Sequence, residues 1–293
     1  VPQIVEKLMD ANIPSPARYH NTGIAAIALA AILWSTGGLF IKWISLPPIS
    51  ILTYRAFFAA LLFLLVFRKK VLVLTPKILL VSCFYALLVG TFVFATKLTT
   101  AANAIFLQYT APLYLIILEP WLFKYKLSLQ NGLTAVFCML GMGLFFLDEF
   151  SLGVLLGNLL ALISGVALAG MMLAQRNNPQ HHHEASIFWG NVWVVIIGFT
   201  FTVNAPFPTV NDWFMLSFLG FIQIGLGYML FTFGLKRVSA LESSLVAMLE
   251  PILNPVWVMI GFGEMPGFYA IIGAAIIIFA LVFKTVYTSY IKI

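Results

Sequence analysis

The sequence predicts an all-α integral membrane protein with ten transmembrane helices, arranged as two inverted five-helix repeats. Of its 293 residues, 62% are hydrophobic and only 9% are charged, whereas a soluble domain usually carries about 25% charged residues. Two similar segments, Thr100–Pro112 and Ser239–Pro251, occupy corresponding places in the two halves. Lys97 and Lys236 are 139 residues apart, as are Pro112 and Pro251 at the ends of these segments. Long apolar spans that repeat halfway along a chain are typical of a transporter.

Ten apolar segments are long enough to cross a bilayer, because a helix rising about 1.5 Å per residue needs about 20 residues to span a core of about 30 Å. In the first half they are Thr22–Ile44, Ile49–Phe67, Lys77–Thr96, Ala101–Phe123 and Leu127–Leu147. In the second half they are Leu152–Ala174, Ala185–Val203, Trp213–Leu235, Ala240–Ile260 and Gly267–Tyr287. The predicted domains are therefore a cytoplasmic or interfacial segment (1–21), a first repeat (22–147) and a second, inverted repeat (152–288).

The positions of lysine and arginine predict the orientation, because cytoplasmic loops carry an excess of both. With a cytoplasmic N-terminus, the inside connections contain Arg68, Lys69, Lys70, Lys77, Lys124, Lys126, Arg176, Lys236 and Arg237. The outside connections contain mostly acidic residues, with Lys97 as the one clear base. We therefore predict a multi-pass protein of the cytoplasmic (inner) membrane with both termini in the cytoplasm. Five spans per half then require the second half to be inverted, as in carriers that alternate between outward-open and inward-open states.

The remaining composition excludes several classes. The net charge of +6 lies in the connections and indicates topology, so no nucleic-acid partner is expected. Cys83 and Cys138 fall inside predicted spans, which argues against a disulfide framework. The His181–His183 tract is interpreted as a polar loop, although adjacent histidines can hold a transition metal loosely. We expect no cofactor and no metal site. The expected partners are membrane lipids and a small-molecule substrate, with the chain a monomer or weak dimer.

Two acidic residues of the ninth span are candidate coupling sites. Glu250 lies near the middle of the span, where an ionised side chain costs about 2.5–3.5 kcal/mol on insertion scales. It could bind a proton or a substrate ammonium group, or serve as a structural ion pair or hydrogen-bond anchor. Glu242 lies near the cytoplasmic end of the same span. It could cap the helix or face solvent, or hold a proton or cation at a cytoplasmic gate.

Two basic residues of the first half are assigned gating or structural roles. Arg55 lies about two turns, or about 9 Å, into the second span. Its guanidinium suits a substrate carboxylate, and it equally suits a structural partner such as Glu264. Lys42 lies near the outer end of the first span, where its long side chain can reach water.

Prolines mark the fourth and ninth spans. Pro112 deprives the Gln108 carbonyl of its helical donor, and Pro251 and Pro255 do the same in the ninth span. Free carbonyls at membrane depth are tolerated beside protein partners or a cavity. These two spans are counterparts under the predicted inversion, so we expect them to meet near the substrate site. A plain packing kink is the alternative.

Polar and aromatic residues of these spans and their neighbours form the predicted substrate-binding set. Such a lining suits a neutral or zwitterionic substrate with an apolar body. The set is Trp34, Tyr85, Asn103, Gln108, Tyr109, Asn158, Tyr228, Ser244 and Glu250. In the sixth span, small residues at four-residue spacing predict a close helix contact: Gly157, Ala161, Gly165 and Ala169.

Several motifs resemble the EamA type of the drug/metabolite transporter superfamily over nearly the whole chain from Thr22. They are Leu-Trp-Ser at 33–35 followed by Lys42, Arg55 within Thr-Tyr-Arg-Ala-Phe-Phe, Leu-Glu-Pro at 249–251, Gly-Glu at 263–264, and the Gly267–Gly273 segment. The first half departs from the pattern at 123–126, where Phe-Lys-Tyr-Lys stands in place of a frequent glutamate. The resemblance implies a ten-helix inner-membrane carrier, commonly an exporter of small metabolites such as amino acids.

The predicted function is therefore a secondary active transporter, an exporter or exchanger, for small amphipathic metabolites with amino acids foremost. The alternatives are export of other metabolites or drugs, such as nucleosides, sugars or lipophilic cations, and a channel. An enzyme is not predicted, because catalysis would need clustered reactive groups within the bilayer. The histidines are confined to His20 and one loop tract.

Overall fold

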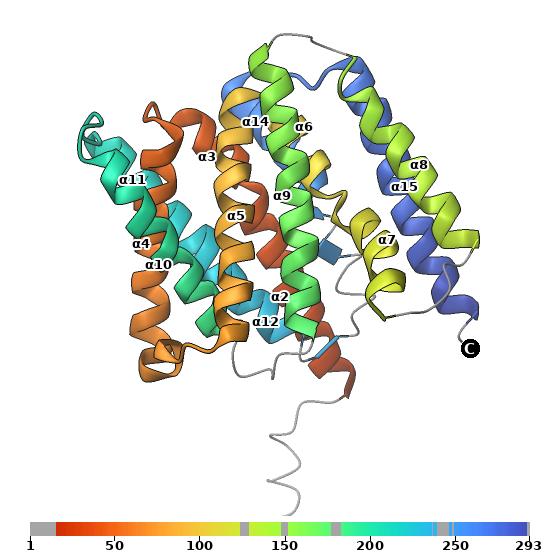
Figure 1. The fold of residues 1–293 in the computed structure, drawn as a ribbon, viewed down its shortest axis with the longest axis horizontal. Helices are drawn as coiled ribbons and strands as arrows, with labels where there is room; N and C mark the ends of the chain where they lie inside the picture. Colours follow the sequence, from red (N-terminus) through yellow and green to blue (C-terminus); the bar gives the residue numbers. More distant parts are fainter. Residues whose placement is uncertain are drawn as a thin grey trace, which may run out of the picture.

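The computed structural model describes residues 16–123, 129–147, 152–176, 183–235, 237–238, 246–247 and 249–291. Within these ranges the chain is helical and contains no strand (Figure 1). The first-half helices are α2 Pro16–Ser35, α3 Gly37–Trp43, α4 Pro48–Phe67, α5 Pro76–Leu98, α6 Ala101–Gln108, α7 Ala111–Phe123 and α8 Leu129–Leu144, with a short 3₁₀ helix, Arg68–Leu72, after α4. The second-half helices are α9 Leu152–Arg176, α10 His183–Thr202, α11 Val210–Ser217, a π-helix Phe218–Leu226, α12 Gly227–Leu235, α14 Leu249–Phe262 and α15 Phe268–Ile291.

Apolar helical segments occur at all ten predicted spans. Seven are long and apolar enough to cross a membrane: His20–Trp43, Pro48–Leu72, Pro76–Leu98, Ala101–Leu118, Leu152–Ala174, His183–Thr202 and Val210–Gly234. Three shorter ones occupy the fifth, ninth and tenth predicted spans: Gly132–Leu144, Leu249–Phe262 and Phe268–Ala280. Large apolar side chains such as Leu65, Phe201 and Phe279 are more than 60% exposed. An outer surface of this kind requires lipid, so the all-α membrane fold is confirmed.

The first span is not the continuous helix that its apolar run predicts. It breaks at Thr36, between α2 and α3. The Ser35 and Thr36 hydroxyls donate to the carbonyls of Ile32 and Leu33, both at 2.7 Å, and such local bonds compete with the helical pattern. Gly37 follows the break with no side chain of its own, and a Cβ atom there would lie 2.7 Å from the Gln223 amide.

The fourth span breaks where its proline predicts. Helix α6 ends at Gln108 and α7 begins at Ala111, one residue before Pro112. In the ninth span, Pro251 lies in the first turn of α14, where its missing N–H costs little. Pro255 is buried inside α14, which continues past it to Phe262. The expected backbone interruption is therefore present in the fourth span, and α14 is not interrupted at Pro255.

The helices pack in pairs that correspond between the two halves. Helix α5 packs on α9 as α12 packs on α2, and α6 packs on α9 as α14 packs on α2. Similarly, α10 packs on α5 as the π-helix packs on α4. The remaining major contacts join counterparts directly, α4 with α10 and α8 with α15. Figure 1 shows α8 and α15 together, apart from α4, α5 and α10.

The ridge of small residues on α9 makes the predicted close contact. A Cβ atom at Gly157 would lie 2.8 Å from the backbone nitrogen of Thr99, and one at Gly165 would lie 3.0 Å from the Gln108 carbonyl oxygen. Ala161 and Ala169 are fully buried. Helix α9 therefore approaches the α5–α6–α7 backbone at the distance that only small residues permit.

Substitution of Gly157 by alanine is expected to destabilise the protein by about 1–3 kcal/mol, because the added methyl group overlaps the Thr99 backbone. Gly153→Ala is the control in the same helix, since nothing lies within 4 Å of its Cβ position. Thermal unfolding in detergent should give a lower Tm for Gly157→Ala than for Gly153→Ala. Equal melting temperatures would contradict the close contact.

Candidate functional site

The two repeated segments meet at a hydrogen bond between Tyr109 and Glu250. Tyr109 follows the last residue of α6, where the broken helix turns its side chain toward α14. Its hydroxyl group donates to Glu250 Oε2 at 2.6 Å and lies 3.4 Å from the Ala247 carbonyl oxygen. The fourth and ninth spans, which the sequence predicts to meet, are therefore in contact through Tyr109 and Glu250, two residues of the predicted substrate-binding set.

Aromatic side chains from three further helices form a group that includes Tyr228, which lies within electrostatic range of Tyr109 and Glu250. The Tyr228 ring of α12 lies 5.0 Å from the Trp34 ring of α2 and 5.9 Å from the Tyr85 ring of α5. Phe231 lies 5.1 Å from Trp34 on the same side. We call Trp34, Tyr85, Tyr228 and Phe231 the aromatic cluster. The first three of these residues belong to the predicted substrate-binding set.

Arg55 completes the buried site from α4. Its side chain is 3% exposed, and its Nε and Nη1 atoms have no hydrogen-bond partner among the described residues. Its charge acts on the Tyr85 and Tyr228 hydroxyl groups, and Glu250 acts on Tyr228 as well. Tyr228 thus lies within the electrostatic range of both buried charges.

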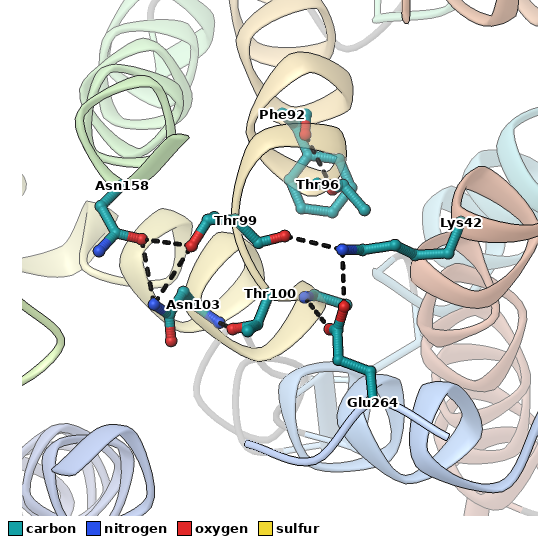
Figure 2. A network of polar contacts seen from close by, with 9 residues as sticks. Lys42, Phe92, Thr96, Thr99, Thr100, Asn103, Asn158 and Glu264 are labelled. Carbon is teal, nitrogen blue, oxygen red and sulfur yellow. Dashed lines mark hydrogen bonds and ion pairs between the residues drawn. The ribbon is translucent and has the colours of Figure 1, made fainter. Parts of the chain in front are cut away.

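The partner suggested for Arg55 from the sequence, Glu264, is wrong. Glu264 Oε2 pairs with Lys42 Nζ at 2.6 Å (Figure 2). Arg55 lies in the N-terminal half of α4, where most of the buried residues of this helix are found, whereas Glu264 lies in the connection after α14. Lys42 also differs from expectation, because its side chain is only 12% exposed and its ammonium group is bound mainly by protein groups.

A cavity of about 330 Å³ leads to the aromatic cluster from one end of the bundle. Phe63 and Phe67 of α4 line it, together with Glu184 of α10 and Arg237. Tyr228 of the aromatic cluster lines it as well. The end that carries Arg237 is the one predicted from the lysines and arginines to be cytoplasmic.

The opposite end is closed by a network around the Lys42–Glu264 ion pair, which Figure 2 shows. Lys42 Nζ also donates to the Thr99 carbonyl oxygen at 2.8 Å, and Glu264 Oε1 accepts from the Ala101 backbone N–H at 2.7 Å. Lys97 Nζ donates to the Ile44 carbonyl oxygen. These bonds tie the ends of the first, third and ninth spans to the start of the fourth.

Asn103 and Asn158 belong to this closed end, away from Glu250. Asn158 Oδ1 accepts from Thr99 Oγ1 at 2.8 Å and from Asn103 Nδ2 at 3.1 Å (Figure 2). Asn158 Nδ2 donates to the Phe145 carbonyl oxygen at 3.2 Å. Both amides were predicted to bind substrate, and the structure instead places them in a buried network that fastens α9 to α6.

Gln108 also departs from the predicted lining. Its Oε1 atom accepts from Ser164 Oγ of α9 at 3.1 Å, so the side chain is bound by a neighbouring helix. Ser244 and Glu242 lie outside the described residues, as does the side chain of Pro112. His181 and His182 lie outside them too, and the described residues contain no His, Cys, Asp and Glu group that could hold a metal ion.

The structure adds two buried amides that sequence reasoning missed, Asn191 and Gln223, and it buries Asn254, a polar residue of the ninth span that the sequence already singled out. Asn191 of α10 donates to the Tyr85 hydroxyl at 3.1 Å. Gln223 of the π-helix donates to the Trp34 carbonyl at 3.2 Å. The side chain of Asn254 is 1% exposed, and among the residues that the structure describes neither of its polar atoms has a hydrogen-bond partner. The feature of the sequence that could have identified these residues as buried polar groups is an uncharged amide side chain within a long apolar run.

A multi-pass helical bundle with a buried polar site, open toward one end and closed toward the other, is the architecture of a membrane transporter. Residues 21–147 and 155–286 match the EamA-like transporter family, and the chain belongs to that family.

Individual proteins that are similar to this chain include transporters. The chain is 26% identical to an uncharacterized transporter of Archaeoglobus fulgidus over 89% of this chain and 95% of that one. It is also 26% identical to a biotin transporter of Escherichia coli K12, over 48% of this chain and 50% of the transporter. A crystal structure of another protein superposes with a TM-score of 0.65, covering 91% of this chain and 97% of that one at 17% identity. At this level of identity, the superposition shows that the two proteins share a fold and nothing more.

Proposed function

We propose that the protein is a secondary carrier that moves small amphipathic metabolites, amino acids foremost, across the cytoplasmic membrane by alternating access. The observation that carries the proposal is the asymmetry of the bundle. A cavity reaches the aromatic cluster from the Arg237 end, while the Lys42–Glu264 ion pair and its hydrogen bonds seal the other end. With the predicted orientation, this is an inward-facing state.

The packing of the helices supports the second, oppositely open state. Each major contact within the bundle has a counterpart when first-half helices are exchanged for second-half helices. If the halves are inverted repeats, the exchange generates a similar structure that is open at the Lys42 end and closed at the Arg237 end. The substrate site would stay near the contact between Tyr109 and Glu250, which the exchange leaves in the middle.

Glu250 is the proposed coupling residue. Its carboxylate is held by Tyr109 at 2.6 Å and lies within electrostatic range of Tyr228, which lines the cavity. A proton or a substrate ammonium group can therefore compete with the Tyr109 hydroxyl for this carboxylate. Glu242 remains a proposed second coupling residue on the same predicted span.

Exchange in liposomes tests the proposal. Vesicles containing the purified protein are loaded with a mixture of unlabelled amino acids, and the uptake of each labelled amino acid is followed. We expect accelerated exchange of aromatic or neutral amino acids relative to protein-free vesicles. Labelled biotin belongs in the panel, because relatives matching half of the chain are biotin transporters. No exchange of any amino acid would contradict that substrate class, and single-channel currents would contradict a carrier.

A further inference from the structure

We propose that Arg55 receives the carboxylate group of the transported molecule. The substrates would then be small carboxylates, zwitterionic ones included, with an aromatic or apolar body. This inference rests on the proposed transport function and narrows it, because it makes the carboxylate the required group and leaves the amino group dispensable.

Arg55 is buried, and in the described ranges it lacks the partners that a guanidinium group normally has in a protein interior. A guanidinium group stays charged and carries five N–H donors, and a buried one is normally paired with a carboxylate. Arg55 is 3% exposed, yet within the described part of the chain its Nε and Nη1 atoms lack a hydrogen-bond partner. Two acidic residues that could have paired with it are bound elsewhere, Glu264 by Lys42 and Glu250 by Tyr109. A buried, unpaired cation is costly, and a bound anion removes that cost.

The neighbours of Arg55 are suited to the same anion. Tyr85 accepts a hydrogen bond from Asn191 Nδ2 at 3.1 Å, which leaves its own O–H proton available for donation. Arg55 acts electrostatically on the Tyr85 and Tyr228 hydroxyl groups. A carboxylate at this point would accept from the guanidinium fork and from a phenol hydroxyl, all of which are donors. A substrate cation would meet a buried positive charge there and be repelled.

The body of the substrate would lie against the aromatic cluster. The ring of Tyr228 lies 5.0 Å from that of Trp34, and Tyr228 also lines the cavity. The cavity volume of about 330 Å³ is at the lower end of the usual range for ligand sites, roughly 300–1,000 Å³. This combination suits a compact molecule with one anionic end and one apolar or aromatic end.

Three ligands that share a phenylethyl group test the inference. They are L-phenylalanine, with both charged groups, 3-phenylpropionate, with the carboxylate alone, and 2-phenylethylamine, with the amine alone. Binding to the full-length protein in detergent is measured by the thermal shift and by quenching of tryptophan fluorescence. Exchange of the same compounds is measured in liposomes. We expect both carboxylates to bind and the amine not to bind.

Substitutions at Arg55 separate a direct contact from a structural role. Arg55→Gln should weaken the binding of both carboxylates about tenfold or more. Arg55→Lys should retain part of it, because a point charge replaces the planar fork. Arg68→Gln is the control, since Arg68 is exposed in the connection after α4. If Arg55→Gln fails to fold, the comparison of Arg55→Lys with the unsubstituted protein on the three ligands decides the matter.

Each result has a definite consequence. Unchanged carboxylate binding in Arg55→Gln overturns the inference, and so does binding of the amine as strong as that of the carboxylates. If neither carboxylate binds while other solutes are exchanged, the inference fails and the carrier function stands. If no solute of any class is exchanged, the proposed function fails as well.

Discussion

Replacement of Glu250 by glutamine is expected to abolish most substrate exchange. The carboxylate lies at the meeting point of the two halves and accepts a hydrogen bond from Tyr109 at 2.6 Å. Glutamine keeps the shape of the side chain but can take up neither a proton nor an ammonium group at physiological pH. Loss of one partner of a buried charged contact costs about 2–5 kcal/mol, and we expect exchange to fall at least about 30-fold. The dependence of the flux on pH should disappear with it.

The measurement is initial-rate exchange in liposomes over a range of pH, at equal amounts of reconstituted protein. Tyr109→Phe is the companion variant. It keeps the Glu250 charge and removes only the hydrogen bond, so we expect a smaller loss and a flux that still depends on pH. Full activity with an unaltered pH dependence in Glu250→Gln would refute the coupling role.

Breaking the Lys42–Glu264 ion pair is expected to open the end of the bundle that it closes. Lys42→Met removes the 2.6 Å contact and the hydrogen bond to Thr99, and Glu264→Gln removes the negative charge that pairs with Lys42. Because both side chains retain some exposure to solvent, we expect a shift of only about 1–2 kcal/mol toward the open state. This corresponds to about a tenfold change in its population.

Labelling of a buried cysteine reports this opening. Ala102 is 2% exposed and adjoins the Ala101 N–H that binds Glu264. Its replacement by cysteine, with Cys83 and Cys138 removed, gives one site for a membrane-impermeant maleimide. Either single substitution should raise the labelling rate about tenfold, and the exchanged pair Lys42→Glu with Glu264→Lys should restore only part of the slow labelling, because it keeps the ion pair but loses the hydrogen bonds to Thr99 and Ala101. A labelling rate that does not change in either single variant would show that other contacts hold this end closed.

Local chemistry predicted the parts of the fold that depend on few residues. Length and hydropathy identified the spans, and Pro112 predicted the end of α6 at Gln108, because a missing N–H acts within one helical turn. The break at Thr36 was missed. Its signal is the Ser35–Thr36 pair before two glycines, and the apolar run around it obscured this signal.

The site was predicted in part, for a reason specific to membrane spans. A span that contacts lipid on one face and protein on the other is apolar all round, so its periodicity does not show which way a polar side chain points. Tyr109 and Glu250 were brought together as expected, whereas Asn103 and Asn158 were bonded to each other at the closed end. The partner of Glu264 depends on how the connections fold over the helix ends. The sequence alone does not show which basic side chain they bring next to Glu264.

Tyr228 belongs to both the cavity and the aromatic cluster, and this double position has a consequence for selectivity by size. Tyr228 lines the cavity and also contacts the rings of Trp34 and Tyr85. Under the proposed function, the bulk of the residue at 228 would set the length of molecule that can pass from the cavity to Arg55 and Glu250 without a movement of the helices. A smaller side chain at this position would then admit longer molecules. The upper size limit of a substrate would thus be determined separately from its charge, by one residue of α12.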